Sequence, residues 1–231
     1  MQYLLQQCLI GLTNGALIAL IALGYTMVYG IIRLINFAHG DLIMLGSCLA
    51  LTLVGAVGMT AAEPATAWGG VALLVAACGL FCGLLNVAVD RVVYRPLRTA
   101  PKLAPLVSAI GVSFIFMNAG LFWIGPADRA FPEILPATNL FPGGWLQFTA
   151  KDLLVVVIVV PLMVAVTAFV KATRLGKAMR AVSQDPTAAA LVGVDVDRVI
   201  AATFFLGGFL GGAASVIYGL YINTISFQMG F

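Results

Sequence analysis

Long apolar stretches separated by short polar segments dominate the sequence. Six stretches have about 20 residues or more, the length that an α-helix needs to cross a hydrocarbon layer of about 30 Å. Several are too long for outer-membrane β-strands, and they do not alternate in polarity. The pattern therefore predicts an all-α, polytopic transmembrane helical bundle with about six spans. The expected spans cover residues 5–32, 41–60, 68–92, 104–125, 152–171 and 199–222.

Composition supports a single transmembrane domain over residues 1–231. The chain is 62% hydrophobic and 9% charged, whereas a soluble domain carries roughly 25% charged residues. The first basic residue is Arg33, so no positive segment precedes the first apolar stretch. We therefore expect that stretch to be a retained span and not a cleaved signal peptide.

The basic residues predict the orientation of the spans. Alternation places ten of the twelve Lys and Arg residues on one side of the membrane, which the positive-inside rule assigns to the cytoplasm. The connection 126–151 then becomes an external loop, and its four prolines predict an ordered cap. The ten residues are Arg33, Arg91, Arg95, Arg98, Lys102, Lys171, Arg174, Lys177, Arg180 and Arg198.

Small residues recur at four-residue spacing within the spans, and such positions let helix backbones approach closely in lipid. Packing inside the chain is the favoured interpretation, with a dimer seam as the alternative. Cys78 and Cys82 share a helix face, but no nearby His or acidic residue completes a metal site, so core packing is favoured for them too. The glycine pairs are Gly11/Gly15, Gly79/Gly83, Gly207/Gly211 and Gly208/Gly212.

One polar segment, "RLINFAHGD", interrupts the apolar pattern between the first two spans. The orientation places it at the cytoplasmic boundary, with Arg33 as an anchor. Gly40 would permit a sharp turn and Asp41 would cap the second helix, while Asn36 and His39 would bond the freed backbone. Alternatively, the segment folds inward as a broken helix and brings Asn36 and His39 to a translocation passage.

A few polar side chains within the spans are the candidates to line such a passage. Asn14 and Thr13 lie in the first span, and Ser108, Ser113 and Asn118 lie in the fourth. Each of them could equally bond a neighbouring helix.

The connection 173–198 is too long for a tight turn and is predicted to contain a helix. Asp185 followed by Pro186 is typical of an N-cap and a first-turn proline. A short helix should then run over residues 187–192, and Gly193 should end it in the left-handed conformation.

This short helix buries little against its own chain. Its alanine and leucine face would suit a groove on another protein, although an amphipathic helix lying on the membrane surface is an open alternative. An aspartate just downstream, Asp195 or Asp197, can cap the next span.

Two motifs resemble a known family. The stretch "TAAALVG", Thr187 to Gly193, resembles the E-A-A-x-x-x-G coupling loop of bacterial import permeases, with Thr187 where glutamate is usual and without the downstream proline. The stretch "GYTMVYGIIRLINFAHGDLIMLGS" resembles the N-terminal signature of the branched-chain amino acid permeases of ATP-binding-cassette importers, and residues 174–212 resemble their loop and following helix. Urea and amide permeases share both motifs.

The resemblance implies a permease subunit in a bacterial inner (cytoplasmic) membrane. Its implied partners are two ATP-binding subunits that hold ATP and Mg, a second homologous permease and a periplasmic substrate-binding protein. Family members usually continue with further spans beyond the equivalent of Phe231, so the set of spans is expected to be incomplete here. The residues implied to couple to the ATPase are Asp185, Pro186, Thr187, Ala188, Ala189, Leu191 and Gly193.

Other functions are less well supported. The chain contains no G-x-x-x-x-G-K-[ST] sequence, so it is not expected to be an ATPase or to hold a cofactor itself. His39 near Asp41 lacks the nucleophile context of a catalytic triad. A proton-coupled carrier built on the same pair is the more serious alternative, although no second ionisable station appears near the centre of another span.

Overall fold

The computed structural model describes residues 2–58, 64–98, 100–101, 103–134, 139 and 147–230. Within these residues the chain is almost entirely helical, with one short two-stranded sheet. The helices are α1 (Gln2–Ile32), α2 (Ala38–Val57), α3 (Pro64–Val89), the π-helix η1 (Asp90–Tyr94), α4 (Arg95–Leu97), α5 (Leu103–Ile124), α6 (Ala150–Ala172), α7 (Arg174–Gln184), α8 (Pro186–Leu191) and α9 (Val196–Ile222). The strands are β1 (Arg129–Ala130) and β2 (Thr224–Ile225).

Six helices in the described residues are long and apolar enough to cross a membrane, which confirms the predicted all-α polytopic bundle. The third span runs on through η1 and α4, so it ends later than expected, while the second begins three residues earlier. The spans are Tyr3–Ile32, Ala38–Val57, Trp68–Leu97, Leu103–Ile124, Ala150–Ala172 and Val196–Ile222.

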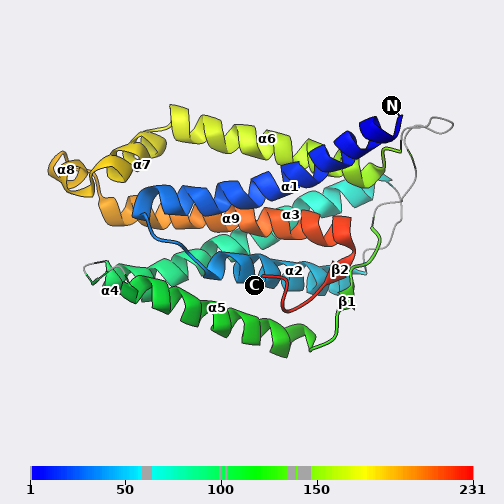
Figure 1. The fold of residues 1–231 in the computed structure, drawn as a ribbon, viewed down its shortest axis with the longest axis horizontal. Coiled ribbons are helices and arrows are strands. Elements are labelled where there is room, and N and C mark those ends of the chain that lie inside the picture. The colour runs from blue at the N-terminus through cyan, green and yellow to red at the C-terminus, as the bar shows by residue number, and fades with distance from the viewer. Residues whose placement is uncertain are drawn as a thin grey trace.

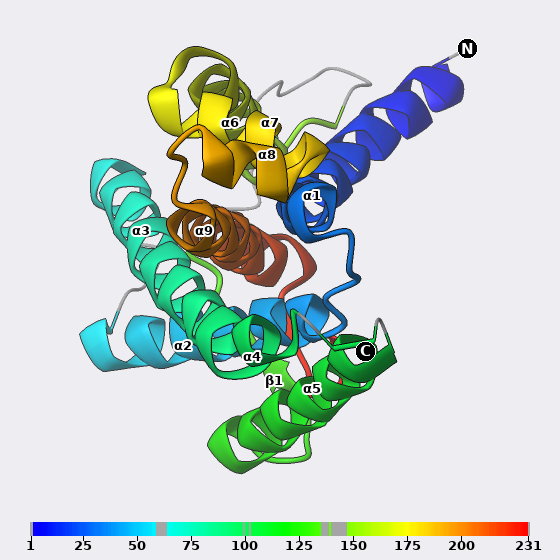
Figure 2. The same cartoon turned by 90° about the vertical axis from the view of Figure 1, so that its left-hand side faces the viewer.

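Helix α9 lies at the centre of the bundle. It packs against α3, α1 and α2, while α5 packs on the far side of α2 (Figures 1 and 2). Within its most apolar 18-residue stretch 72% of the residues are buried, whereas the corresponding stretches of α1 and α6 are each 22% buried. A helix this enclosed needs small residues wherever its neighbours come close.

The glycines of α9 provide that close approach. A Cβ at Gly208 would lie 2.5 Å from the carbonyl oxygen of Cys82, and one at Gly207 would lie 2.8 Å from the carbonyl oxygen of Gly24. Gly211 and Gly212 likewise face α2 and α3. The predicted packing within the chain is therefore confirmed for α9.

The other two glycine pairs differ from each other. A Cβ at Gly79 or Gly83 of α3 would lie within 2.9 Å of an aromatic ring of α9, so this pair also packs inside the chain. Among the residues that the structure describes, a Cβ added at Gly11 or Gly15 of α1 would meet nothing within 4 Å. The described part of the chain therefore leaves this face of α1 open.

The two ends of the bundle are chemically different. Helices α4, α7 and α8 and the start of α9 lie at one end, called here the basic end (Figure 1). Nine of the ten basic residues predicted to share a side belong to segments at this end, and Lys102 lies outside the described residues. At the other end β1 pairs antiparallel with β2, Arg129 opposite Ile225. Part of the expected cap, residues 135–138 and 140–146, lies outside the described residues.

Candidate functional site

Helix α8 forms as its sequence predicts. The Oδ1 of Asp185 accepts hydrogen bonds from the backbone N–H groups of Thr187 at 2.8 Å and Ala188 at 3.0 Å, and Pro186 occupies the first turn. Gly193 follows the helix with φ of +88°. Cap, proline and left-handed glycine are therefore all confirmed as the signals that delimit this helix.

The surface of α8 is only partly as expected. Ala189 is 3% exposed, because α8 lies against α7 and the start of α9. Leu191 and Val192 are instead 85% and 79% exposed, although both are large and apolar. Helix α8 lies at the extreme of the basic end (Figure 1), and these two side chains are exposed there.

A tight junction joins α8 to α9. The backbone N–H of Val194 donates to the carbonyl of Ala189 at 3.0 Å, and the Asp195 side chain caps α9 by accepting from the N–H of Arg198. Of the two predicted alternatives, Asp195 is therefore the cap. Asp197 has a different role.

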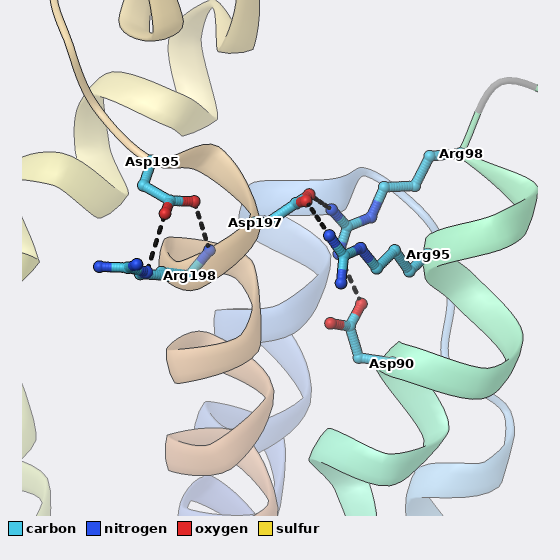
Figure 3. A network of polar contacts seen from close by, with 6 residues as sticks. All are labelled: Asp90, Arg95, Arg98, Asp195, Asp197 and Arg198. Atoms are coloured by element: carbon cyan, nitrogen blue, oxygen red, sulfur yellow. Dashed lines mark hydrogen bonds and ion pairs between the residues drawn. The ribbon is translucent and has the colours of Figure 1, made fainter.

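Asp197 belongs to a group of ion pairs that Figure 3 shows between α9 and α4. Its carboxylate accepts from Arg95 at 2.6 Å and from Arg98 at 2.5 Å, and Arg98 also donates to Asp90 at 2.8 Å. We call Asp90, Arg95, Arg98 and Asp197 the Asp197 cluster. The sequence shows charged residues at these span ends. It contains no signal that pairs Asp197 with Arg95 and Arg98, about 100 residues earlier.

The break before α2 differs from its prediction in three ways. Helix α2 begins at Ala38, and its N-cap residue, Phe37, makes no side-chain cap. Gly40 is an ordinary helical residue and not a turn. Asp41 does not cap the helix, because it lies in the first turn, where its buried carboxylate accepts a hydrogen bond from Ser113 of α5.

The depth of the break also corrects the expectation. His39 lies beside Gly24 of α1 and Gly211, near the middle of α9. Gly24 precedes the end of α1 by eight residues, or about 12 Å at 1.5 Å per residue. The chain therefore turns back into the bundle after α1 (Figure 1), and α2 starts well inside it and not at the cytoplasmic boundary.

Buried amides hold the start of α2 in place. The Oδ1 of Asn36 accepts from the N–H of Ala38 at 3.1 Å and from the hydroxyl of Tyr94 at 3.2 Å. Asn36 Nδ2 donates to Asn86 Oδ1 at 3.3 Å, and Asn86 Nδ2 donates to the carbonyl of Phe204 at 2.7 Å. Asn36 thus bonds the freed backbone as predicted. Sequence reasoning missed Asn86 and Tyr94.

His39 does not share this role. Its side chain is 1% exposed, and neither ring nitrogen has a hydrogen-bond partner among the described residues. The ring packs edge-on to Tyr25 at a centroid distance of 5.8 Å and fills the space opposite two glycines. The prediction that His39 bonds the backbone is wrong.

The polar residues proposed for a passage do not gather at one place in the chain. Asn14 is exposed on the outer face of α1, and Asn118 is exposed on α5 and donates to its own helix at Phe114. Ser113 contacts the start of α2, where its hydroxyl donates a hydrogen bond to Asp41. Whether any of them touches a substrate stays a prediction.

The cysteines of α3 are core residues in this structure. Cys78 and Cys82 are both fully buried, and the Cys82 thiol lies 3.4 Å from the carbonyl oxygen of Leu42. The described residues contain no group of three or more His, Cys, Asp or Glu side chains that could hold a metal.

The fold and this geometry define a class of protein: a polytopic membrane protein with a capped helix displayed at its basic end and a helix break inside its bundle. Residues 7–231 match the family described as "Branched-chain amino acid transport system / permease component". The chain belongs to this family.

Curated relatives agree with that assignment. The chain is 37% identical to the high-affinity branched-chain amino acid transport system permease protein LivH of Escherichia coli K12, over 99% of the chain and 75% of that protein. It is 36% identical to the corresponding BraD of Pseudomonas aeruginosa, over 98% of the chain and 74% of that protein. A probable branched-chain amino acid permease of Methanocaldococcus jannaschii is 26% identical, over 86% of the chain and 61% of that protein. No solved structure matches.

Proposed function

We propose that this chain is the permease subunit of a bacterial ATP-binding-cassette importer and carries branched-chain amino acids across the inner membrane. The observation that carries the proposal is the display of Leu191 and Val192 on a capped helix at the basic end. An exposed apolar pair on a short helix suits the helix-in-groove mode of binding. Because the chain belongs to a permease family, we assign the groove that receives this helix to an ATP-binding subunit in the cytosol.

In the proposed mechanism the cytosolic partners supply the energy. Two ATP-binding subunits hold ATP and Mg and close upon each other when ATP binds. Helix α8 moves with them, and the spans reorient around a passage shared with a second, homologous permease. A periplasmic binding protein delivers the substrate to the opposite end, whose connection at residues 126–151 is the proposed external loop.

The surface beside the α2 break supports an apolar substrate. Ile35 and Phe37 flank the buried Asn36, and their side chains are 36% and 44% exposed. In this proposal the two side chains face the passage, where an apolar surface lets a hydrophobic substrate pass without holding it, because delivery requires release.

Reconstituted transport tests the proposal. The chain, its two ATP-binding subunits, the second permease and the binding protein are placed in liposomes, and uptake of radiolabelled leucine, isoleucine and valine is measured with and without ATP. Leu191→Asp should weaken the hold of the ATP-binding subunits about tenfold or more, because it places a charge in an apolar anchor site. Leu191→Met, which stays apolar, should preserve uptake.

Two results would contradict the proposal. Uptake of urea or acetamide in place of leucine would assign the chain to the related amide permeases. Uptake that survives ATP depletion and collapses with the proton gradient would make it a secondary carrier.

A further inference from the structure

The first turn of α9 is joined closely to α8. Four residues, Val192 to Asp195, connect the two helices, and the backbone N–H groups of the first three donate to Ala188, Ala190 and Ala189. The Asp195 cap then begins α9 at once. A displacement of α8 therefore passes directly to Asp197, which sits in that first turn.

Asp197 follows a residue that lines a cavity. This cavity of about 270 Å³ opens at the basic end and is lined by Val196, by Val182 and Pro186 of α7 and α8, and by Tyr94 and Arg98. Side chains do not fill this space. The Asp197 carboxylate holds Arg95 and Arg98, the second of which lines the cavity, at 2.6 and 2.5 Å (Figure 3).

The segment that Asp197 holds is also tied to the α2 break. Helices η1 and α4 form one continuous helical segment from Asp90 to Leu97. Tyr94, which is 2% exposed, directs its hydroxyl to Asn36 Oδ1, the same atom that accepts from the backbone N–H of Ala38 at the start of α2. One short segment thus contacts the start of α9 at one point and the start of α2 at another.

The π-helical turn η1 ends at Tyr94, directly before Arg95. A π-helix is rare and is often found at functional sites, because its extra residue widens the turn. In η1 the buried residues are Asp90 and Tyr94. Asp90 accepts from Arg98 at 2.8 Å, so the segment is also braced along its own length.

We propose that Asp197, Arg98 and Tyr94 are positioning residues that transmit movement of α8 to the helix break before α2. The segment Asp90 to Arg98 is the connecting element. Docking of an ATP-binding subunit on α8 displaces Asp197, the two arginines follow it, and Tyr94 shifts Asn36 and with it the first turn of α2. This inference rests on the proposed function, which supplies the movement of α8.

The exposure of the ion pair between Asp197 and Arg95 argues for this role over simple stabilisation. The side chains of Asp197 and Arg95 are 48% and 57% exposed, and ion pairs exposed to this degree add little to the stability of a fold. Their three-way geometry nevertheless fixes α4 relative to α9. Removing the charge of Asp197 should therefore release the connection and leave the bundle folded.

The same turn of α9 offers a matched control. Arg198 pairs with Asp195 at 2.8 Å, three residues before it in the same chain segment, and its side chain is 88% exposed. Arg198→Gln therefore removes an ion pair on this turn without touching α4.

The experiment compares variants in the reconstituted complex, with leucine uptake and ATP hydrolysis measured on the same liposomes. Asp197→Asn and Tyr94→Phe should each lower leucine uptake per ATP hydrolysed about two- to fivefold, the effect of one ordinary polar contact on an equilibrium. Asp197→Glu, which keeps the charge, should restore the ratio, and Arg198→Gln should leave it unchanged. The double variant should be no worse than the poorer single variant, because both interrupt one connection.

A thiol probe adds a direct readout of the break. In a Cys8→Ser background, the thiol of a Phe37→Cys variant, at a half-exposed position, should change its rate of maleimide labelling when vanadate arrests ATP hydrolysis. The same probe should lose that response when Asp197→Asn is added.

Several results would overturn the inference. The ratio of leucine uptake to ATP hydrolysis could stay unchanged in both single variants, or fall as far in Arg198→Gln as in Asp197→Asn. The loss in the double variant could equal the product of the two single losses. The change in maleimide labelling could also persist in Asp197→Asn. A parent complex without ATP-driven uptake would instead refute the proposed function.

Discussion

Replacing Gly208 by alanine tests whether α9 is held against α3 by direct backbone contact. The added Cβ would lie 2.5 Å from the carbonyl oxygen of Cys82 and 2.7 Å from the Cβ of Asn86. Comfortable carbon contacts are about 3.5–4.0 Å, so the two helices must separate by about 1 Å. Neither atom belongs to a flexible side-chain end, so the strain has no easy local relief.

The expected cost is that of overpacking a tight core. Such insertions lower the free energy of unfolding by about 1–3 kcal/mol, which reduces the folded-to-unfolded ratio about 5- to 140-fold. The same displacement would stretch the 2.7 Å bond from Asn86 to the carbonyl of Phe204. Losing that bond would add about 1 kcal/mol.

Gly11→Ala is the matched control, because this helical glycine has nothing within 4 Å. Alanine favours a helix over glycine by about 0.5–1 kcal/mol, so this variant should be as stable as the parent or slightly more so. Thermal denaturation in detergent, followed as the monodisperse fraction by size-exclusion chromatography, ranks the proteins, and steric trapping gives the free energies. Equal stability of Gly208→Ala and the parent, or equal loss in Gly11→Ala, would refute the close helix contact.

Three further changes test polar groups. Arg98→Gln should lower the free energy of unfolding by up to about 3 kcal/mol, because it leaves the buried Asp90 carboxylate without its cation. Adding Asp90→Asn should recover part of that loss, as measured by thermal denaturation. A double variant no more stable than Arg98→Gln alone would contradict this. Ser113→Ala should cost about 1–3 kcal/mol by removing the donor to the buried Asp41, and Ser113→Thr should not, as the same melting assay would show. Asp185→Ala should destabilise α8 by about 1 kcal/mol, seen as faster hydrogen exchange of the α8 amides with no change in the global melting temperature.

The sequence predicted the elements of this fold more completely than their contacts. Apolar length alone located all six spans, because a helix in lipid must satisfy its own backbone. The signals of α8 were equally local: Asp185 and Pro186 at one end and Gly193 at the other. Each acts within a few residues and needs no knowledge of the rest of the chain.

The break before α2 could not be located in this way. Gly40 and Asp41 are residue types that also occur at turns and caps, so their pattern fitted a cytoplasmic boundary. Their actual place depends on Gly24, which leaves room for the His39 ring inside the bundle. It also depends on Ser113, which donates a hydrogen bond to the Asp41 carboxylate. Contacts between residues that are distant in sequence leave no periodic trace, and the Asp197 cluster was missed for the same reason.

The depth at which α2 begins has a consequence for how the protein is made. The non-helical segment 33–37 lies beside polar groups that come from α3 and the end of the third span, chiefly Asn86 and Tyr94. Freed backbone in a hydrocarbon layer is costly until protein groups satisfy it. Helix α2 therefore cannot reach its final position when it first enters the membrane during synthesis. It settles only after later spans have been synthesised, so the order of translation and the order of assembly differ in this chain.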